Sequence, residues 1–376
     1  MESIKNKNIG RTVLISGASM AGLSTAWWMN KLGYQVTVVE MAEKPRTAGG
    51  AVDIKEAAIE AVKRMGIFEQ LKAHQLNVEL IEFKNAEDAT QGSISLINNG
   101  EGLPDDEIEI ERDIFVGILF DKIKNNVECI FNNSITALKE TDDDIEVTFR
   151  TEVKRSFDLV LGCDGLHSAV RRISFGHETA YTHFLGAYFS LTILNKLIIQ
   201  QKTMQMYNVP DKAIMLNAYK NKTDIIFCFN SEKEIQYDYR DEEQQKKIIL
   251  ERFAGQGWRT EALLDVINNA NHFYFDKFCQ IKMPSWTKGR VALVGDSGYC
   301  ASPAAGMGAS LSVIGATTLA DALQKYNGNY ELAFQDYNQN LRPFIEEVQA
   351  RAETNVRESF IPRTEEAIQK RNMNGF

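Results

Sequence analysis

The stretch from Thr12 to Glu40, TVLISGASMAGLSTAWWMNKLGYQVTVVE, decides the fold. Its apolar start, Thr12 to Ile15, predicts a parallel strand buried on both faces. The residues from Ala21 to about Lys31 predict a helix, and Gly33 is a typical helix stop. Tyr34 to Glu40 predicts a second strand because it is rich in β-branched residues. Strand, glycine turn, helix and strand together predict a βαβ unit.

The turn inside this unit has the pattern Gly17-x-Ser19-x-x-Gly22. A dinucleotide diphosphate needs backbone N–H groups and a helix N-terminus directed at it, and glycines permit the close approach. Serine replaces the middle glycine, so the loop alone also fits an ordinary strand-to-helix turn. Glu40 ends the next strand, where a carboxylate accepts hydrogen bonds from an adenosine ribose. The predicted nucleotide-binding residues here are Gly17, Ser19, Met20, Ala21, Gly22 and Glu40.

Composition sets the remaining bounds. The chain has 376 residues, 44% of them hydrophobic, which is enough for one large or two intertwined units. Its net charge of −9 argues against nucleic acid or an anionic membrane as the main partner. No apolar run reaches the length of about 18 residues needed for a membrane span. Five scattered cysteines without CxxC pairing predict no disulfide framework and no metal site, and favour a cytoplasmic protein.

Two further motifs lie far along the chain. An apolar strand ends at Asp164-Gly165, and a second one, Val291 to Val294, ends at Gly295-Asp296 and continues through Pro303 to Gly306-Met307-Gly308. Taken singly, such pairs are ordinary turn residues. The last three residues run into a predicted helix, whose N–H groups and dipole would favour negative charge placed before them.

These three motifs, in this order and spacing, resemble the single-component FAD-dependent monooxygenases of the aromatic-hydroxylase (para-hydroxybenzoate hydroxylase-like) family. The similarity covers nearly the whole chain and is strongest over Val13 to Ile54 and Phe273 to Leu323. The stretch FYFDKFCQIKMPSWTKGRVALVGDSGYCASP, residues 273–303, is similar to a branch that includes tetracycline-inactivating monooxygenases. That branch also contains many members of unknown substrate, so the resemblance does not name a substrate here.

The resemblance implies roles for individual residues. Glu40 would hold the adenosine ribose, and Arg112, at the start of its helix, would reach the FAD diphosphate. Arg46 and the run Gly49 to Asp53 would lie beside the flavin. Asp164 and Gly165 would serve FAD, with the nicotinamide donor as a second partner for Asp164. The implied contacts to the ribityl and isoalloxazine parts are Gly295, Asp296, Pro303, Gly306, Met307 and Gly308.

The expected fold class is α/β: a Rossmann-like FAD-binding domain with an inserted mixed-sheet substrate domain and a C-terminal helix. The FAD-binding domain is predicted to comprise residues 1–77, 105–178 and 287–325. Residues 78–104 and 179–286 are predicted to form the substrate-binding domain, and 326–376 a C-terminal helical segment. The final polar residues, 364–376, are expected to fray.

No catalytic side chain is assigned, because a flavin C4a-hydroperoxide would itself transfer oxygen. The chain need only place an electron-rich carbon near the flavin and exclude water. Alternation along the predicted strands gives each an apolar face that lines either a pocket or an ordinary sheet core. Tyr299 either hydrogen-bonds the substrate or packs in the core. The candidate pocket residues are Asp53, Met204, Met206, Met215, Phe227, Phe229 and Tyr299.

The leading hypothesis is a monooxygenase that uses FAD, NADPH or NADH, and O2 to hydroxylate an aromatic or polycyclic small molecule, with a tetracycline-like antibiotic among the candidates. One alternative is another FAD enzyme of this fold, such as an oxidase or halogenase; the WxWxIP segment typical of halogenases is absent from the sequence. Another is a flavin-containing ligand-binding protein without turnover. An NAD-linked dehydrogenase would leave the second and third motifs without a purpose. The sequence does not fix the oligomeric state.

Overall fold

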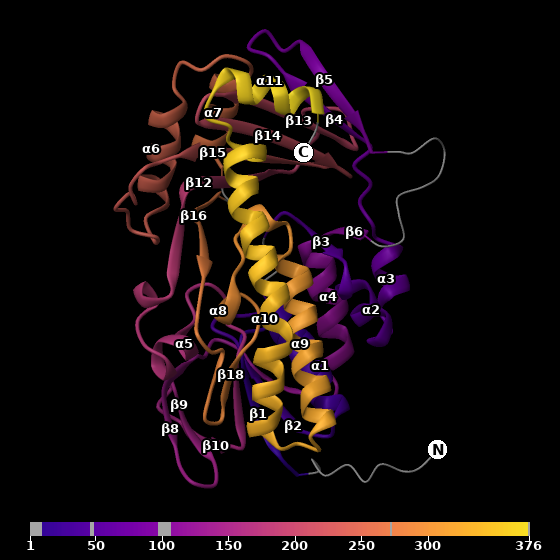
Figure 1. The fold of residues 1–376 in the computed structure, drawn as a ribbon, viewed down its shortest axis with the longest axis vertical. Helices are drawn as coiled ribbons and strands as arrows, with labels where there is room; N and C mark the ends of the chain where they lie inside the picture. The colour runs from indigo at the N-terminus through magenta and orange to yellow at the C-terminus, as the bar shows by residue number, and fades with distance from the viewer. Residues whose placement is uncertain (1–9, 46–48, 97–106, 271–272, 375–376) are drawn as a thin grey trace.

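A six-stranded sheet forms the lower half of the molecule (Figure 1). The computed structural model describes residues 10–45, 49–96, 107–270 and 273–374. Every neighbouring pair in this sheet is parallel except β17 with β18. Its strands are, in spatial order, β17 (Thr287–Lys288), β18 (Val291–Leu293), β11 (Leu159–Gly162), β1 (Thr12–Ser16), β2 (Gln35–Val39) and β7 (Glu128–Ile130). Central strands such as β1 and β11 are almost wholly apolar because helices and neighbouring layers cover both faces.

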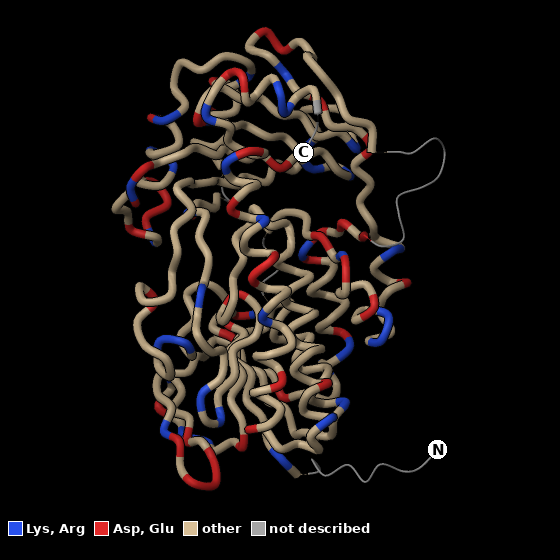
Figure 2. Tube along the Cα trace, in the orientation of Figure 1, with Lys and Arg blue, Asp and Glu red and all other residues tan. Residues whose placement is uncertain are grey.

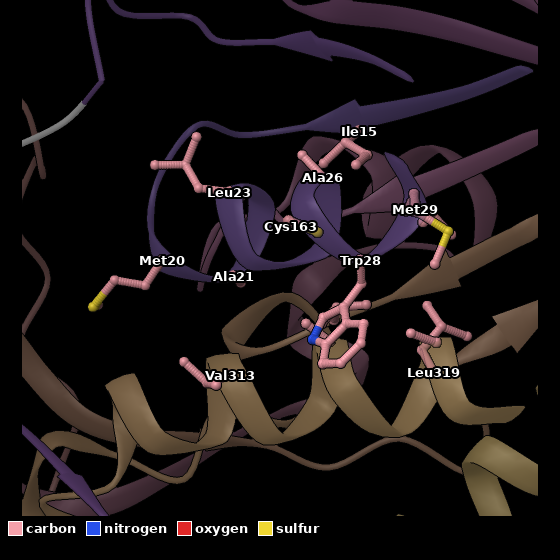
Figure 3. Packing of buried hydrophobic residues seen from close by; sticks show 14 of the residues in the cluster. Ile15, Met20, Ala21, Leu23, Ala26, Trp28, Met29, Cys163, Val313 and Leu319 are labelled. Atoms are coloured by element: carbon pink, nitrogen blue, oxygen red, sulfur yellow. The ribbon is translucent and has the colours of Figure 1, made fainter. Parts of the chain in front are cut away.

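Helices from both ends of the chain pack together beside this sheet. Figure 3 shows Trp28 of α1 (Met20–Lys31) directed toward α9 (Gly308–Lys325), between Val313 and Leu319. The indole Nε1 of Trp28 donates a hydrogen bond of 2.9 Å to Oγ1 of Thr317. The remaining helices of this half are α2 (Ala57–Arg64), α3 (Phe68–Lys72), α4 (Arg112–Ile123), α5 (Ala169–Ser174), the short α8 (Asp296–Tyr299) and the 3-10 turns η1 (Glu178–Ala180) and η2 (Pro303–Ala305). The first βαβ unit is therefore completed by a helix near the other end of the chain.

A seven-stranded sheet forms the upper half (Figure 1). Its strands are, in spatial order, β16 (Phe273–Ile281), β12 (Thr182–Leu194), β15 (Lys222–Asn230), β14 (Lys212–Tyr219), β13 (Thr203–Val209), β4 (Leu80–Lys84) and β5 (Thr90–Ser95). Only the β13–β4 pair is parallel. It joins two segments that are far apart in the sequence. On one face, α6 (Glu242–Phe253) and α7 (Thr260–Asn268) bury the aromatic core of the sheet.

Smaller elements lie between the two halves or at the lower end of the molecule (Figure 1). The antiparallel ribbon of β3 (Ala51–Lys55) and β6 (Glu107–Glu111) lies next to α9. A three-stranded sheet, β8 (Ile135–Glu140), β9 (Ile145–Phe149) and β10 (Lys154–Phe157), lies at the lower end. The long helix α10 (Tyr330–Thr354) runs beside α9 toward the upper half and continues as a π-helix, η3 (Asn355–Phe360). Lysines, arginines, aspartates and glutamates are interspersed over both halves (Figure 2).

The expected α/β class, with a nucleotide-binding fold and a mixed sheet, is confirmed. One local expectation is wrong. The C-terminal residues do not fray, since α11 (Glu365–Asn374) packs on the upper sheet through the buried Arg371. Among the described helices none is long and apolar enough to cross a membrane.

Candidate functional site

The glycine loop admits no side chain at either end. Gly17 has a φ of +105°, and a Cβ placed on it would lie 2.5 Å from the carbonyl oxygen of Cys163. A Cβ on Gly22 would lie 1.8 Å from the carbonyl oxygen of Gly17. Helix α1 therefore starts in direct contact with the strands β1 and β11. Only glycine permits this approach, which is the arrangement that places helix N–H groups against a diphosphate.

The N-terminus of α1 carries no acidic residue in its first turn and no side-chain cap. Ser19 stands at the N-cap position, but its hydroxyl accepts a hydrogen bond from Nη2 of Arg112, at 3.1 Å. Arg112 is the first residue of α4, and its Cδ lies 2.7 Å from a Cβ placed on Gly49. The helix dipole and a guanidinium thus meet at one place, which suits a doubly charged anion.

Glu40 follows β2 and is turned toward the same loop. Its side chain is 8% exposed, and its Oε2 accepts a hydrogen bond of 2.8 Å from the backbone N–H of Ala18. Its Oε1 accepts one of 2.9 Å from Ala42. A carboxylate oxygen carries more than one lone pair, so acceptor capacity remains for a ribose hydroxyl. The geometry agrees with the ribose role that the resemblance implies.

We expect Glu40→Ala to weaken FAD binding about tenfold, because a charge-assisted hydrogen bond contributes about 1.5–3 kcal/mol. Titration of the apoprotein with FAD, followed by flavin fluorescence, measures the change. Glu43→Ala is the matched control, since Glu43 is an exposed residue of the loop that follows β2. Equal FAD affinity in the two variants would remove Glu40 from the site.

The Asp164 side chain of the second motif has a structural role in the fold. The Asp164 carboxylate caps α5: its Oδ2 accepts from the N–H groups of Ala169 and Val170, at 2.9 and 3.1 Å, and its Oδ1 from the Ser168 hydroxyl. Burial raises the pKa of this carboxyl. The backbone of Asp164 lies against Gly17, whereas the side chain holds α5 in place. A contact between Asp164 or Gly165 and the cofactor or nicotinamide donor stays a prediction.

The third motif is joined to the second by a buried cation. Gly295 has a φ of +74° and stands before α8. Arg171 of α5 is fully buried and donates to the carbonyl oxygen of Ser297 in α8, at 2.8 Å. It also donates to the carbonyl oxygen of Leu166 and to the Glu178 carboxylate, at 3.2 Å. The two motifs therefore hold a fixed position relative to each other.

Asp296 follows Gly295, which packs against the first turn of α1. Burial raises the pKa of its carboxyl, and the positive charge of Arg112 opposes that rise. A Cβ on Gly295 would lie 3.0 Å from Cβ of Ala21, so Asp296 is packed close to the glycine loop. Arg112, Asp296 and the loop thus converge from three distant segments. Arg46, the other predicted arginine, lies outside the described residues.

The segment before α9 is strained and leaves open space at its end. Ser302 has a φ of +82°, although it is not glycine, and Gly306 has a φ of +60°. A Cβ on Gly308, the first residue of α9, would meet no atom within 4 Å. Like α1, this helix has neither an acidic first turn nor a side-chain cap. Pro303, Gly306, Met307 and Gly308 therefore surround an open, electropositive helix end.

Asp53 lies directly beside this helix end. Its Oδ2 is 3.3 Å from a Cβ placed on Gly306. The Ser310 hydroxyl donates to the Asp53 carbonyl oxygen at 2.9 Å and accepts from the Lys55 N–H at 3.0 Å, which fixes β3 to α9. The β3–β6 ribbon is thereby held between α9 and the upper sheet.

The predicted pocket residues divide between two faces. Met204, Met206 and Met215 lie on the face of the upper sheet that packs on η2, in one cluster with Ala304. Phe227 and Phe229 lie on the opposite face, in the core beneath α6, so their assignment to the pocket is wrong. Alternation along a strand correctly predicts that Met204 and Met206 share one face and that Phe227 and Phe229 share one face. It does not predict which layer covers each face.

Tyr299 is also a core residue. It is fully buried, its ring packs on Trp286, and its hydroxyl accepts a hydrogen bond of 3.0 Å from the Tyr337 hydroxyl. A Cβ on Gly315 of α9 would lie 1.7 Å from that hydroxyl. The packing interpretation of Tyr299 is therefore right and the substrate-binding one is wrong.

Sequence reasoning missed three polar residues between the halves: Glu109 on β6, Asn217 on β14 and Asp224 on β15. Nδ2 of Asn217 donates to Oε1 of Glu109, at 3.3 Å. The alternation in Glu-Ile-Glu-Ile-Glu, residues 107–111, was the available signal. It predicts a strand with carboxylates along one face, but not that the face is buried.

These residues fit FAD on structural grounds. Two uncapped helix N-termini, an arginine and a loop closed to any Cβ suit a bound dinucleotide diphosphate and an electron-poor ring system. The described residues contain no group of three or more histidine, cysteine, aspartate or glutamate side chains placed to hold a metal ion. The residues that would hold the diphosphate are Gly17, Ser19, Gly22, Arg112 and Asp296.

Comparison with known proteins agrees with this geometry. Residues 11–352 match the model of the family described as "FAD binding domain". A flavin-dependent monooxygenase of an unknown prokaryotic organism is 35% identical, covering 96% of this chain and 94% of its own. One from Legionella longbeachae is 36% identical, covering 91% of this chain and 87% of its own.

Solved structures give the same result. The crystal structure of tetracycline destructase Tet(51) is similar with a TM-score of 0.84 and 36% identity, covering 97% of this chain and 95% of its own. That of Tet(55) has a TM-score of 0.86 and 32% identity, covering 99% and 95%. The FAD cofactor and the fold inferred from the three motifs are thus confirmed. The chain belongs to the FAD-binding-domain family of flavin-dependent monooxygenases.

Proposed function

We propose that this protein hydroxylates an aromatic or polycyclic small molecule, with NADPH or NADH as the electron donor and O2 as the oxidant. The balance is one substrate C–H, one O2, one reduced nicotinamide and one proton giving C–OH, oxidised nicotinamide and water. The observation that carries the proposal is the open N-terminus of α9, placed between the glycine-loop unit and the methionine-bearing face of the upper sheet.

Bound FAD would supply the electron transfer and oxygen activation that no protein side chain provides. The chain supplies the surroundings. The α1 N-terminus and Arg112 would neutralise the diphosphate, and the α9 N-terminus would stabilise negative charge on the reduced ring. Met204 and Met215 give a soft, adaptable apolar surface, which suits a flat ring system and keeps water away.

The similarity to Tet(51) and Tet(55) supports tetracyclines as the first substrates to test. The five cysteines are all free thiols and four of them are buried, which supports a reducing, cytoplasmic location. A tetracycline substrate and a cytoplasmic location are therefore part of the proposed function.

A substrate panel tests it, with tetracyclines and polyphenols supplied to the FAD-loaded protein. We expect at least one compound to accelerate oxidation of NADPH or NADH and to yield a product heavier by one oxygen atom. In oxygen-18 gas that atom carries the heavy label. Peroxide release that matches substrate turnover, with no oxygen-18 in the product, would instead identify an oxidase. Tight binding without faster nicotinamide oxidation would identify a ligand-binding protein.

A further inference from the structure

The β3–β6 ribbon places two carboxyl groups face to face beside α9. Asp53 and Glu109 are directly opposite each other in the antiparallel register. Like charges in such a pair destabilise a sheet. A third carboxyl comes from Asp224 on the upper sheet, whose Oδ2 lies 2.7 Å from a Cβ placed on Gly50, at the start of the ribbon. Two ionised carboxylates in this position would repel each other, so the pair is most stable with one carboxyl protonated or with a cation beside it.

Most acidic groups on this ribbon already have a cation. Glu111 forms ion pairs with Lys220 and Lys222. Lys55 lies 3.7 Å from Asp53 and 3.6 Å from Glu107. Within the described part of the chain, neither Glu109 nor Asp224 has a lysine, arginine or histidine at ion-pair distance.

The hydrogen-bond partners of these two carboxyls are neutral donors. Glu109 accepts from the Asn217 amide, and Asp224 accepts from the Tyr219 hydroxyl at 2.8 Å and from the Ala51 N–H. Two acceptor groups with spare lone pairs thus lie at the junction of the halves, and the described cation that acts on Asp224, Lys222, stays beyond ion-pair distance.

Asn217 supplies independent evidence for a missing donor. Its side chain is 6% exposed, and its Oδ1 is buried with no hydrogen-bond partner. A buried acceptor left unpaired lowers the stability of the fold. Because its Nδ2 is bonded to Glu109, the free oxygen lies at the same cluster. Three acceptor groups therefore meet here, and among the described residues no donor reaches Oδ1 of Asn217.

The charge states agree with this arrangement. Burial, followed by the charge of Asp53, raises the pKa of Glu109 to about 8. Burial also raises the pKa of Asp224 to about 6. At pH 7 the Glu109 carboxyl is thus largely protonated. A cation bound beside it would lower its pKa and favour loss of that proton. An ammonium group carries both a positive charge and N–H donors, which matches two carboxyl groups and an unpaired amide oxygen.

We propose that Glu109, Asp224 and Asn217 form a subsite for a protonated amine on the substrate, next to the position of the reacting ring. The amine would donate its N–H groups to the two carboxylates and to Oδ1 of Asn217. This inference rests on the proposed function and narrows its substrate class to aromatic or polycyclic amines.

Binding of a matched pair of fluorescent compounds to the FAD-loaded protein tests it without turnover. Aminomethylanthracene carries the ammonium, and hydroxymethylanthracene is its neutral counterpart, also a hydrogen-bond donor. We expect the amine to bind roughly 10- to 100-fold more tightly at pH 7, the range for a charge-assisted hydrogen bond. Equal affinities, or binding of neither compound, would overturn the subsite.

Substitutions test whether Glu109 and Asp224 cause the preference for the amine. Glu109→Gln and Asp224→Asn keep the shape of each side chain, and each is expected to lower the amine preference about fivefold. The double variant removes it. Glu107→Gln is the control, because Glu107 lies on the same face of the same strand but pairs with Lys55. A preference that survives the double variant, or that Glu107→Gln removes, would contradict the assignment.

Proton release gives a second readout that needs no variant. Calorimetry in buffers of different ionisation enthalpy should find close to one proton released per amine bound at pH 7. Above about pH 9 the release falls toward zero, since Glu109 is then ionised before binding. The groups that face Glu109 in this titration are Asp53, Lys55, Glu107, Glu111, Asn217, Tyr219, Lys220, Lys222 and Asp224. No proton release at pH 7 would overturn the subsite.

These experiments distinguish failure of the amine subsite from failure of the proposed monooxygenase function. If the amine preference is present but no compound is oxygenated, the subsite stands and the monooxygenase proposal falls. If neutral polycycles are oxygenated and the anthracene pair binds equally, the oxygenase stands and the subsite falls.

Discussion

Gly22→Ala is expected to abolish FAD binding and to destabilise the whole molecule. The new Cβ would lie 1.8 Å from the carbonyl oxygen of Gly17, a backbone atom that no rotamer change can move. Helix α1 would have to shift away from β1, which opens the loop and the buried contact with α9. We expect a loss of about 3 kcal/mol in the free energy of unfolding, at the upper end for overpacking. Chemical denaturation and flavin absorbance of the purified protein measure both effects.

Gly117→Ala provides the matched control. Gly117 also lies inside a helix, α4, but it is exposed and a Cβ there would meet no atom within 4 Å. The substitution should stabilise the protein by about 0.5–1 kcal/mol, because alanine loses less backbone entropy. If Gly22→Ala binds FAD as tightly as Gly117→Ala, the close approach of α1 does not create the diphosphate site.

Arg171→Met is expected to lower the free energy of unfolding by about 3 kcal/mol. The fully buried guanidinium donates to Ser297 and Leu166 carbonyl oxygens and to the Glu178 carboxylate. Methionine fills much of the volume but leaves these acceptors without their donor. Because Arg171 joins the Asp-Gly and Gly-Asp motifs, flavin retention should fall together with stability.

The neighbouring Arg172 is exposed, so Arg172→Met separates loss of charge from loss of the buried contacts. Surface substitutions of this kind change stability by no more than about 0.5 kcal/mol. Similar denaturation midpoints for the two variants would mean that the link between the motifs does not support the fold.

The first βαβ unit could be predicted well because its signals are local. The run before Gly17 is too apolar for anything but a buried strand, and β1 and α1 form where expected. The start of α4 at Arg112 follows for the same reason. The packing of the C-terminal helix α11 on the upper sheet could not be predicted, since its polar sequence is held by the tertiary contacts of Arg371 with Asn208 and Ser359.

The site was only partly predictable for a related reason. Motif glycines report backbone crowding, which is a local property, and Gly17 and Gly22 are crowded in the expected way. Which layer covers a given face of a sheet is not a local property. Nothing local distinguishes Met215 from Phe227 as a pocket residue, because α6 covers one face and η2 the other. Likewise Glu109 looks like a solvated acid until β3 and the upper sheet enclose it.

The packing of α1 on α9 has a consequence for biosynthesis. Trp28 and its partner Thr317 are 289 residues apart, so at about 5–20 residues per second a ribosome needs roughly 15 to 60 s to synthesise the segment between them. During that time the nascent chain carries an uncovered tryptophan face, a binding target for chaperones. Flavin loading would begin only after α9 has left the exit tunnel, and flavin supply would then act on released chains rather than during elongation.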